Sequence, residues 1–331
     1  MSKLKLSFSC WNYDRIQPLL DGRVQPEGID LVGFNLPVEE TFFRMLRHRE
    51  FDIAEMSLSS YAVSLTRPER PFVALPVFPS RVFRHGCVYV NTASGIRTPK
   101  DLIGRKIGCP EYQMTAPVWI RGILQDEYGV PVDSVSYHTG GEEEPGRDEK
   151  LKLDLPPNIR VQPIGPAQTL SAMIADGDID AFYTARMPST YRAGVPGKVA
   201  RLFEDYVPVE QAYYRKTRIF PIMHTVVIRR ELYEQHRWVA MSLYKAFCAA
   251  QQATYRDLYV TASYAAMLPW LTANIEEARR ELGDDFWPYG FAPNRATLAT
   301  FLRYHQEQGL SKRRLEPEEL FAPETLESFK I

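Results

Sequence analysis

The sequence contains few cysteines, and they lie far apart. Its four cysteines are Cys10, Cys87, Cys109 and Cys248, and no two of them form a Cys-x-x-Cys pair. This spacing excludes a zinc ribbon and a dithiol redox motif. We therefore expect free thiols in a reducing compartment.

Long apolar runs and a strong net charge are also lacking. No apolar stretch approaches the roughly 18 residues that a membrane-spanning helix needs. The 40 Lys and Arg residues balance 41 Asp and Glu residues, so a basic nucleic-acid-binding surface is not indicated. The amino terminus, MSKLKLSFSC, begins an alternating strand pattern without the apolar stretch and cleavage site of a secretory signal. We expect a cytoplasmic protein with neither membrane nor nucleic-acid partners.

Several familiar motifs are missing as well. The chain has no His-Glu-x-x-His zinc helix, no phosphate-binding loop ending in Lys-Ser or Lys-Thr, and no Gly-x-Ser-x-Gly elbow. Its six histidines form no close ligand pair. Distant residues such as Glu55, His85 and His224 could still assemble a metal site, because chain spacing says little about spatial distance. We predict no metal and no cofactor.

What the sequence does contain is an internal repeat at a constant offset of 128 residues. Each copy has the pattern of an amphipathic helix followed by a short strand that begins near an aspartate. The matched positions are Thr41, Met45 and Asp52 in the first copy and Thr169, Met173 and Asp180 in the second. The repeat predicts equivalent units in two lobes.

A second pairing supports two similar lobes. KLSFSC at 5–10 and RKIGCP at 105–110 are predicted to be short strands, each followed by a loop and a helix. Each lobe is thus predicted to be a small open α/β sheet, in which ligands bind beyond the carboxyl ends of the strands. The loops at those ends are 10–15, 55–60, 109–116 and 183–189.

The chain length also favours two lobes over a single core. The β-rich segments RVFRHGCVYV at 81–90 and TRIFPIMHTVVIRR at 217–230 are interpreted as two hinge crossovers. We expect residues 1–90 plus 206–331 to form lobe 1 with carboxyl-terminal helices, and residues 91–205 to form lobe 2. The ligand cleft would lie between the lobes.

The carboxyl-terminal part has helical periodicity from Glu231 onward, with Leu232, Val239, Leu243 and Phe247 on one face. These helices are expected to pack on lobe 1, and their exposed aromatic residues favour a homo-oligomer. The acidic, Gly-rich segment TGGEEEPGRDEK at 139–150 is interpreted as a solvent-exposed excursion.

An anion in the predicted cleft needs fixed donors, which the amino termini of helices supply. Serine and threonine are also ordinary helix caps, so each of these residues has a structural alternative. The candidate substrate-binding residues on the predicted strand-end loops are Asn12, Ser57, Ser59, Ser60, Tyr112, Gln113 and Thr115.

Arginines supply further candidates for binding a carboxylate. Arg186 follows the strand pattern DAFYTA, and its guanidinium fork suits a carboxylate, although a surface ion pair is the alternative. Arg81, Arg84 and His85 cluster on the first crossover. At strand spacing, Arg81 and His85 share a face and Arg84 points away.

Two further residues are candidates for proton transfer. His224, in FPIMHTVVI, suits a proton donor, and a structural histidine is the alternative. Glu55 is expected at a strand end, where burial would raise its pKa into a useful range. A salt bridge from Glu55 to an arginine is its structural alternative. His85 is the second candidate donor.

Several segments together resemble the 4,5-dihydroxyphthalate decarboxylase family, which has the type II periplasmic-binding-protein fold. The resemblance extends over nearly the whole chain, and the histidine-bearing segment and the WPYG segment are its most specific parts. The segments are FPSRVFRH at 78–85, NTASGIRTPKDLIGRKIG at 91–108, DAFYTARMP at 180–188, RIFPIMHTVVIRREL at 218–232 and WPYGFAPNRATLATFLRYHQEQGL at 287–310.

The resemblance implies that an aromatic dicarboxylate, 4,5-dihydroxyphthalate, loses one carboxylate to give protocatechuate and carbon dioxide. His224 or His85 would then protonate the ring carbon in the cleft, Glu55 or a histidine would act as general base, and Arg186 with the helix-terminus donors would hold the retained carboxylate. A non-catalytic solute-binding protein is the competing expectation, because one hinged fold serves both tasks. A related enzyme acting on another hydroxylated aromatic acid is a third.

Overall fold

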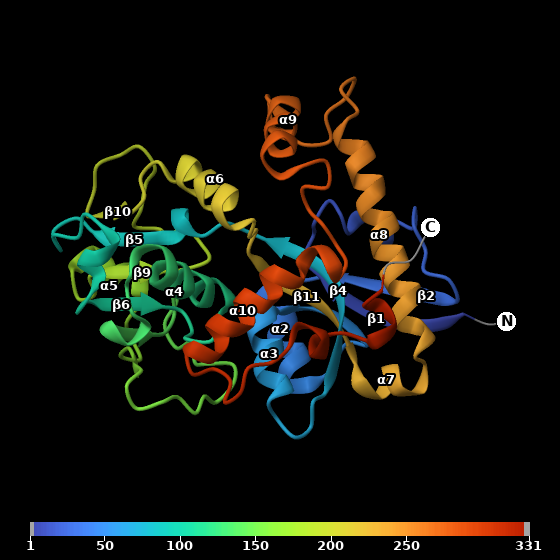
Figure 1. Ribbon diagram of the computed structural model, residues 1–331, viewed down its shortest axis with the longest axis horizontal. Coiled ribbons are helices and arrows are strands. Elements are labelled where there is room, and N and C mark those ends of the chain that lie inside the picture. The colour runs from blue at the N-terminus through green and yellow to red at the C-terminus, as the bar shows by residue number, and fades with distance from the viewer. Residues whose placement is uncertain (1–2, 328–331) are drawn as a thin grey trace. The chain divides into compact units, whose positions relative to one another are not determined.

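The computed structural model describes residues 3–327, which form two compact α/β units (Figure 1). Unit 1 contains the chain up to Arg81, residues Ile222–Ala296, and the chain from Glu316 on. Unit 2 contains residues Val82–Pro221 and Thr297–Leu315. The mixed α/β composition of both units confirms the predicted fold class.

Unit 1 is built on a five-stranded sheet with the strand order β2-β1-β3-β11-β4. Strands β1, β2 and β3 are parallel, and β11 lies antiparallel between β3 and β4. The carboxyl ends of β1, β3 and β4 therefore share one edge of the sheet with the beginning of β11. The strands are β1 (Leu4–Cys10), β2 (Ile29–Asn35), β3 (Ile53–Ser57), β4 (Phe72–Arg81) and β11 (Ile222–Arg229).

Helices cover both faces of this sheet. Phe8 of β1 packs against Phe247 of α8 with 5.5 Å between the ring centroids, whereas the next residue, Ser9, hydrogen-bonds to Thr41 of α2. Because successive strand residues point to opposite faces, α2 and α8 lie on opposite sides. The helices of unit 1 are α1 (Gln17–Leu20), α2 (Val38–His48), α3 (Leu58–Leu65), α7 (Arg230–Gln235), α8 (Trp238–Leu258) and α9 (Leu271–Leu282).

Unit 2 is built on a six-stranded sheet with the order β10-β5-β9-β6-β7-β8. The strands are β5 (Val88–Asn91), β6 (Lys106–Cys109), β7 (Ser136–Thr139), β8 (Arg160–Pro163), β9 (Ala181–Tyr183) and β10 (Val199–Arg201). The helices are α4 (Thr115–Tyr128), α5 (Leu170–Asp176), α6 (Tyr206–Thr217) and α10 (Arg295–Glu307), the last beginning in unit 1. No helix in the described part of the chain is long and apolar enough to cross a membrane.

The two sheets confirm the predicted internal repeat. The parallel order β2-β1-β3 in unit 1 corresponds to β7-β6-β9 in unit 2. The repeated aspartates have the same role, since each follows a helix and accepts a hydrogen bond from the middle strand of its parallel trio, β1 in unit 1 and β6 in unit 2. Asp52 accepts the backbone N–H of Ser7 at 2.8 Å, and Asp180 accepts that of Lys106 at 2.9 Å.

The boundaries between the units differ from the expected ones at 90/91 and 205/206. The chain leaves unit 1 after Arg81 and returns at Ile222, because β4 and β11 pair with each other within the sheet of unit 1. The helix α6 belongs to unit 2, where Glu210 accepts the backbone N–H of Gly86. Most of the segment expected to form a return crossover is thus a core strand of unit 1.

The sequence predicted that the carboxyl-terminal helices pack on lobe 1, but not all of them pack on unit 1. The α8 side chains Val239, Leu243 and Phe247 are buried in unit 1 as predicted. Helix α10, however, packs on α4 in unit 2, where Trp119 contacts the rings of Phe301 and Tyr304. An amphipathic pattern shows that a helix has a buried face, but it does not show which unit covers that face.

Candidate active site

Strands β3 and β11 bring Glu55 and His224 together near the edge of the unit 1 sheet at which β1, β3 and β4 end. Every residue of β3 is buried. In the antiparallel register, Glu55 lies opposite Val226, and His224 lies opposite Ser57. Residues opposite each other, and residues two apart, project from the same face of a sheet. The acid and the imidazole therefore share one face.

Glu55 and His224 form a hydrogen-bonded pair. The Nδ1 atom of His224 lies 2.6 Å from Oε1 of Glu55, and Glu55 is completely buried. The His224 side chain keeps 16% of its surface exposed, and the ring of Phe42 packs edge-on against the imidazole at 4.8 Å. Because Nδ1 is engaged with the carboxylate, Nε2 is the ring nitrogen available for proton transfer.

The carboxyl group of Glu55 has a lower pKa than usual, which corrects the expectation of a raised one. Burial alone would raise this pKa, but the attraction of His224 and the hydrogen bonds from His224, Tyr13 and the Trp11 N–H together lower it. Its partner is a histidine, in place of the arginine considered as an alternative. Glu55 therefore remains a carboxylate, suited to orienting the imidazole.

Tyr13 and Cys10 complete the surroundings of Glu55, and sequence reasoning had selected neither for the site. The Tyr13 hydroxyl donates to Oε1 of Glu55 at 2.7 Å, and the Cys10 thiol lies 3.4 Å from Oε2. Burial and the nearby Glu55 charge raise the pKa of both groups. Both residues lie at the predicted loop 10–15, whose only selected member, Asn12, is exposed and accepts a hydrogen bond from Gln17.

Arg15 holds the same loop in place. Its guanidinium lies over the ring of Tyr13 at 4.3 Å and over that of Trp287 at 4.2 Å, and its Nε donates to the carbonyl of Pro79 at 2.7 Å. These contacts tie the loop after β1 to β4 and to the WPYG segment. Contacts with β4 and with the WPYG segment thus fix the position of Tyr13 beside Glu55.

The three serines selected from sequence lie directly after Glu55. Ser57 is the amino-terminal cap of α3, and its side chain accepts the backbone N–H of Ser60 at 3.4 Å. Ser59 and Ser60 lie in the first turn of α3 and are buried. The helix terminus expected near this strand end is present in unit 1, and Ser57 has the structural capping role that was the alternative.

Arg81 is buried in unit 1 and binds the WPYG segment. Its guanidinium donates to the Pro288 carbonyl at 2.8 Å and to the Asn294 side chain. The expectation that Arg81 and His85 share a strand face is wrong, because β4 ends at Arg81 and His85 begins a 3₁₀ turn in unit 2. Arg81 therefore has a structural role, since it holds the loop that contains Pro288 and Asn294.

His85 is enclosed by aromatic rings in unit 2. The rings of Phe203, Tyr213 and Tyr128 lie at centroid distances of 5.2, 5.3 and 6.0 Å. Neither ring nitrogen has a hydrogen-bond partner among the described residues. Burial lowers the pKa of His85 to about 4, so the imidazole is neutral near pH 7. Of the two candidate proton donors, His224 has the environment expected of a general acid, because a carboxylate holds its Nδ1 and part of its side chain is exposed.

Arg186 lies in unit 2 just after β9, as predicted, and is exposed. Its backbone N–H donates to the Thr184 hydroxyl at 3.1 Å, and that hydroxyl also contacts Glu142. Burial raises the pKa of Glu142, and the Arg186 charge acts in the opposite direction. A positively charged side chain is therefore present at this strand end.

The other unit 2 candidates surround the beginning of α4. Thr115 is its first residue, and Tyr112 is buried with its hydroxyl donating to the Gln308 carbonyl at 3.0 Å. Gln113 is fully buried, and its side-chain amide has no hydrogen-bond partner among the described residues. Tyr112 thus has a structural contact, whereas Gln113 keeps its donor and acceptor available.

The acidic segment 139–150 is not simply solvent-exposed, which corrects the sequence-based expectation. Glu142 is buried, and Glu143 accepts hydrogen bonds from Ser171 and from Ser189. Arg147 donates to the buried carboxylate of Glu111 at 2.6 Å. The segment lies over the strand ends of unit 2 because its charged side chains find buried partners there. In the residues that the structure covers, no group of three or more His, Cys, Asp or Glu side chains could hold a metal ion.

Comparison with solved structures identifies the fold. The periplasmic aliphatic sulphonate binding protein of Escherichia coli is 13% identical, covers 97% of this chain and 92% of its own, and superposes with a TM-score of 0.51. The alkanesulfonate-binding protein of Xanthomonas axonopodis pv. citri is also 13% identical, with a TM-score of 0.50 and coverage of 98% and 97%. The chain therefore has a periplasmic-binding-protein fold.

Curated relatives identify the family. A 4,5-dihydroxyphthalate decarboxylase of Comamonas testosteroni is 45% identical over 331 residues, which is the whole length of both chains. One of Pseudomonas putida is 44% identical over 215 residues, covering 65% of this chain and 83% of the relative. No family model matches the chain. The chain belongs to the 4,5-dihydroxyphthalate decarboxylase family and is a carboxy-lyase.

Proposed function

We propose that this chain removes one carboxylate from 4,5-dihydroxyphthalate and releases protocatechuate and carbon dioxide. The structural observation that supports this reaction most directly is the hydrogen bond between His224 Nδ1 and the buried Glu55. A histidine oriented by a carboxylate is a suitable acid for the protonation that the reaction needs.

The chemistry explains why an acid is required. Direct loss of carbon dioxide would leave a localised aryl anion. If the ring carbon that bears the carboxylate is protonated first, the hydroxyl group para to it supplies electron density to the ring. The bond to the carboxylate then breaks, its electron pair restores the aromatic ring, and carbon dioxide leaves. One proton from the enzyme replaces one carboxylate.

The residues of unit 1 are assigned the proton-transfer steps. Nε2 of His224 delivers the proton to the ring carbon and is reprotonated from solvent. Glu55 holds the imidazole through Nδ1 and stabilises its positive charge before transfer. Tyr13 donates a second hydrogen bond to the same carboxylate oxygen, which makes Tyr13 a positioning residue.

The remaining parts of the proposal concern binding and context. Arg186 and the donors at the beginning of α3 are assigned to the carboxylate that the product retains, because a guanidinium and helix-terminal N–H groups favour an anion. A cytoplasmic location and self-association also belong to the proposal. They are consistent with an aromatic-acid decarboxylase and with the exposed apolar residues of unit 1.

The proposal is tested by incubating the purified chain with 4,5-dihydroxyphthalate in D₂O. We expect carbon dioxide and a protocatechuate with one deuterium at the carbon that lost its carboxylate. Replacing His224→Ala or Glu55→Gln should lower kcat by about 10²–10⁴-fold, the usual range for a general acid. His48→Ala is the control, because His48 is an exposed histidine of unit 1.

Three outcomes would contradict parts of the proposal. Near-normal turnover by a folded His224→Ala variant would remove His224 as the acid. Binding of 4,5-dihydroxyphthalate without any product would favour a solute-binding protein, and turnover of a different hydroxylated aromatic acid would move the substrate assignment. Circular dichroism of each variant separates loss of chemistry from loss of fold.

A further inference from the structure

The loop after β6 in unit 2 is associated with buried polar atoms that the fold does not use. Gln113 is completely buried, and neither polar atom of its side-chain amide has a hydrogen-bond partner among the described residues. The Oε2 atom of Glu149 is also buried and has no partner within residues 3–327. Leaving such groups unpaired is costly, so their presence indicates a ligand that pairs with them.

Gln113 and Glu149 are neighbours in space. The Glu149 carboxylate accepts the backbone N–H groups of Tyr112 and Gln113. The bond from Tyr112 reaches Oε1 and leaves Oε2 for another donor. A carboxylate oxygen that accepts therefore lies beside an amide that both donates and accepts. We call these two residues the Gln113–Glu149 site.

Glu111, a second carboxylate near this loop, has a different role. It is buried and accepts from Arg147 at 2.6 Å and from the backbone N–H of Lys150 at 3.2 Å. Burial raises its pKa, but the charges of Lys150 and Arg147 outweigh burial and lower it. Burial and the Glu111 charge raise the pKa of Glu149 to about 7, although Lys150 acts in the opposite direction. Glu111 thus stays ionised and holds the segment, whereas Glu149 can take up and release a proton near neutral pH.

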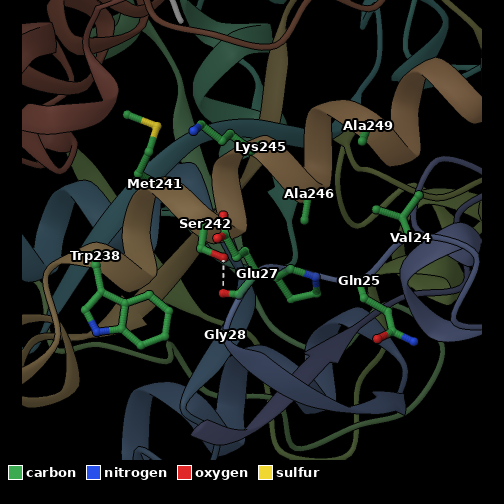
Figure 2. Close-up of a pocket in the computed structure, with 11 residues that line it drawn as sticks. Val24, Gln25, Glu27, Gly28, Trp238, Met241, Ser242, Lys245, Ala246 and Ala249 are labelled. Atoms are coloured by element: carbon green, nitrogen blue, oxygen red, sulfur yellow. Dashed lines mark hydrogen bonds between the residues drawn. The ribbon is translucent and has the colours of Figure 1, made fainter. Parts of the chain in front are cut away.

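An open hollow beside α8 in unit 1 has a different chemistry. It has a volume of about 700 Å³ and lies between α8 and the loop before β2 (Figure 2). Ser242 donates to the Glu27 carbonyl at 2.7 Å, and Gln25 accepts from Lys3 at 3.0 Å. The structure describes all of its lining residues, and none of them has a buried side-chain polar atom without a partner. The hollow therefore offers apolar contact, whereas the Gln113–Glu149 site offers hydrogen bonds.

The Gln113–Glu149 site favours hydroxyl groups over carboxylates. Two neighbouring glutamates repel a carboxylate, whereas a phenolic O–H donates to a carboxylate oxygen and an adjacent hydroxyl bonds to an amide. Arg186, which suits a carboxylate, follows strand β9. Strands β6 and β9 pair with each other, so they lie about 5 Å apart. One benzene ring can bridge such a separation, with its carboxylate toward Arg186 and its hydroxyls toward Glu149.

We propose that Gln113 and Glu149 bind the two hydroxyl groups of the aromatic substrate, and that Glu149 accepts the proton of the hydroxyl para to the departing carboxylate. The identity of that substrate rests on the proposed function. The proposal adds a proton acceptor in unit 2 to the proton donor in unit 1.

The proton that Glu149 accepts is returned within the same reaction. As His224 protonates the ring carbon, the O–H bond of the para hydroxyl breaks toward Glu149 and its oxygen forms a C=O bond. The bond to the carboxylate then breaks, its electron pair restores the aromatic ring, and carbon dioxide leaves. The oxygen recovers its proton from Glu149. The net change is still one proton from His224 in place of one carboxylate.

The hydroxyl-binding role is tested by calorimetry with protocatechuate and benzoate, which share one carboxylate and differ in the two hydroxyls. We expect the natural chain to prefer protocatechuate, and Glu149→Gln to reduce this preference about 10–100-fold, as for one charge-assisted hydrogen bond. The new amide oxygen can still accept the backbone N–H groups that Glu149 accepts, so the loop keeps these bonds. Asp148→Asn is the matched control, because it removes a charge from an exposed neighbour and should leave the preference unchanged.

A second variant, Gln113→Met, separates a ligand-binding role from a structural one. Methionine has a similar length and shape but no amide. We expect the variant to unfold at the same or a higher urea concentration than the natural chain, because an unpaired buried polar group is removed. Its preference for protocatechuate should fall about tenfold. Lower stability with an unchanged preference would overturn the role of Gln113.

Turnover of 4,5-dihydroxyphthalate tests the proton transfer. Glu149→Gln should lower kcat by about 10²–10⁴-fold, the usual contribution of a general base, and Asp148→Asn should leave kcat unchanged. A loss of preference for protocatechuate at an unchanged kcat would overturn the proton transfer. An unchanged kcat and an unchanged preference in a folded Glu149→Gln variant would overturn the whole inference and leave the proposed reaction standing. If the natural chain forms no product but its preference still depends on Glu149, the reaction and the proton transfer fall and the hydroxyl-binding site stands.

Discussion

At the scale of single residues, two histidines show how the surroundings decide the behaviour of an imidazole. His224 has a carboxylate on Nδ1 and keeps part of its ring exposed. His85 is enclosed by aromatic rings and has no polar partner for either nitrogen in the described residues. The first environment favours proton transfer, and the second penalises a charged ring.

The buried His85 should make the stability of the chain fall at mildly acidic pH. Its folded pKa of about 4 lies below the ordinary 6.5. Between these values the unfolded chain binds a proton that the folded chain does not, so stability is lost as pH falls from 6.5 to 4. The full effect is about 3 kcal/mol. In urea unfolding at a series of pH values, His85→Phe should remove most of this loss.

The effect of His85→Phe on packing is measured separately from its effect on protonation. Near pH 8 both the natural chain and the variant carry no charge at position 85, so a difference there reports packing alone. Only the part of the difference that grows between pH 6.5 and pH 4 belongs to the proton. Parallel stability curves for the two chains over this range would contradict the prediction.

Glu55 and His224 could both be selected from the sequence as candidates for proton transfer, but their contact could not be predicted. They are 169 positions apart and meet because β11 returns to lie antiparallel beside β3. The direction of the Glu55 pKa shift depends on that contact and could not come from burial alone. Tyr13 could not be selected from the sequence, because a single tyrosine in a loop forms no recognisable motif.

At the scale of elements, the contact of α4 with α10 depends on one glycine. Gly122 lies inside α4 and faces the ring of Tyr304, which is buried. A Cβ at this position would lie 2.1 Å from Cδ2 of Tyr304. Glycine normally weakens a helix interior, so its presence is explained by the closeness of the ring.

Replacing Gly122→Ala should therefore destabilise the chain, although alanine favours helices. We expect a loss of about 1–3 kcal/mol in the free energy of unfolding, the usual cost of overpacking, measured by thermal or urea unfolding. Gly197→Ala is the matched control in unit 2, because the nearest atom to its added Cβ lies 4.0 Å away. Equal or higher stability for Gly122→Ala would show that Tyr304 moves aside freely.

The repeat predicted equivalent units in the two lobes, because matched helix–strand patterns fold into matched units. It could not place α10 on unit 2, since the apolar face of α10 fits either unit equally well as a pattern. Nor could composition show that the acidic segment 139–150 is held in place. Its order depends on buried partners such as Thr184 and Ser171, which lie far along the chain.

At the scale of the whole molecule, the groups assigned to the reaction come from both units. Glu55, Tyr13 and His224 belong to unit 1, whereas Arg186 belongs to unit 2. The proposed division of labour is that unit 1 moves the proton and unit 2 contributes charge for the carboxylate that stays on the ring. Such a division predicts different kinetic effects for substitutions in the two units.

Arg186→Ala should raise KM for 4,5-dihydroxyphthalate by roughly 10–100-fold, the loss expected for a charge-assisted hydrogen bond of about 1.5–3 kcal/mol. The retained carboxylate keeps its charge throughout the reaction, so ground state and transition state lose the contact equally and kcat should change little. Arg192→Ala, at another exposed arginine of the same segment, is the control. An unchanged KM would remove Arg186 from the site, and a fall in kcat at constant KM would mean that Arg186 acts on the reacting carboxylate.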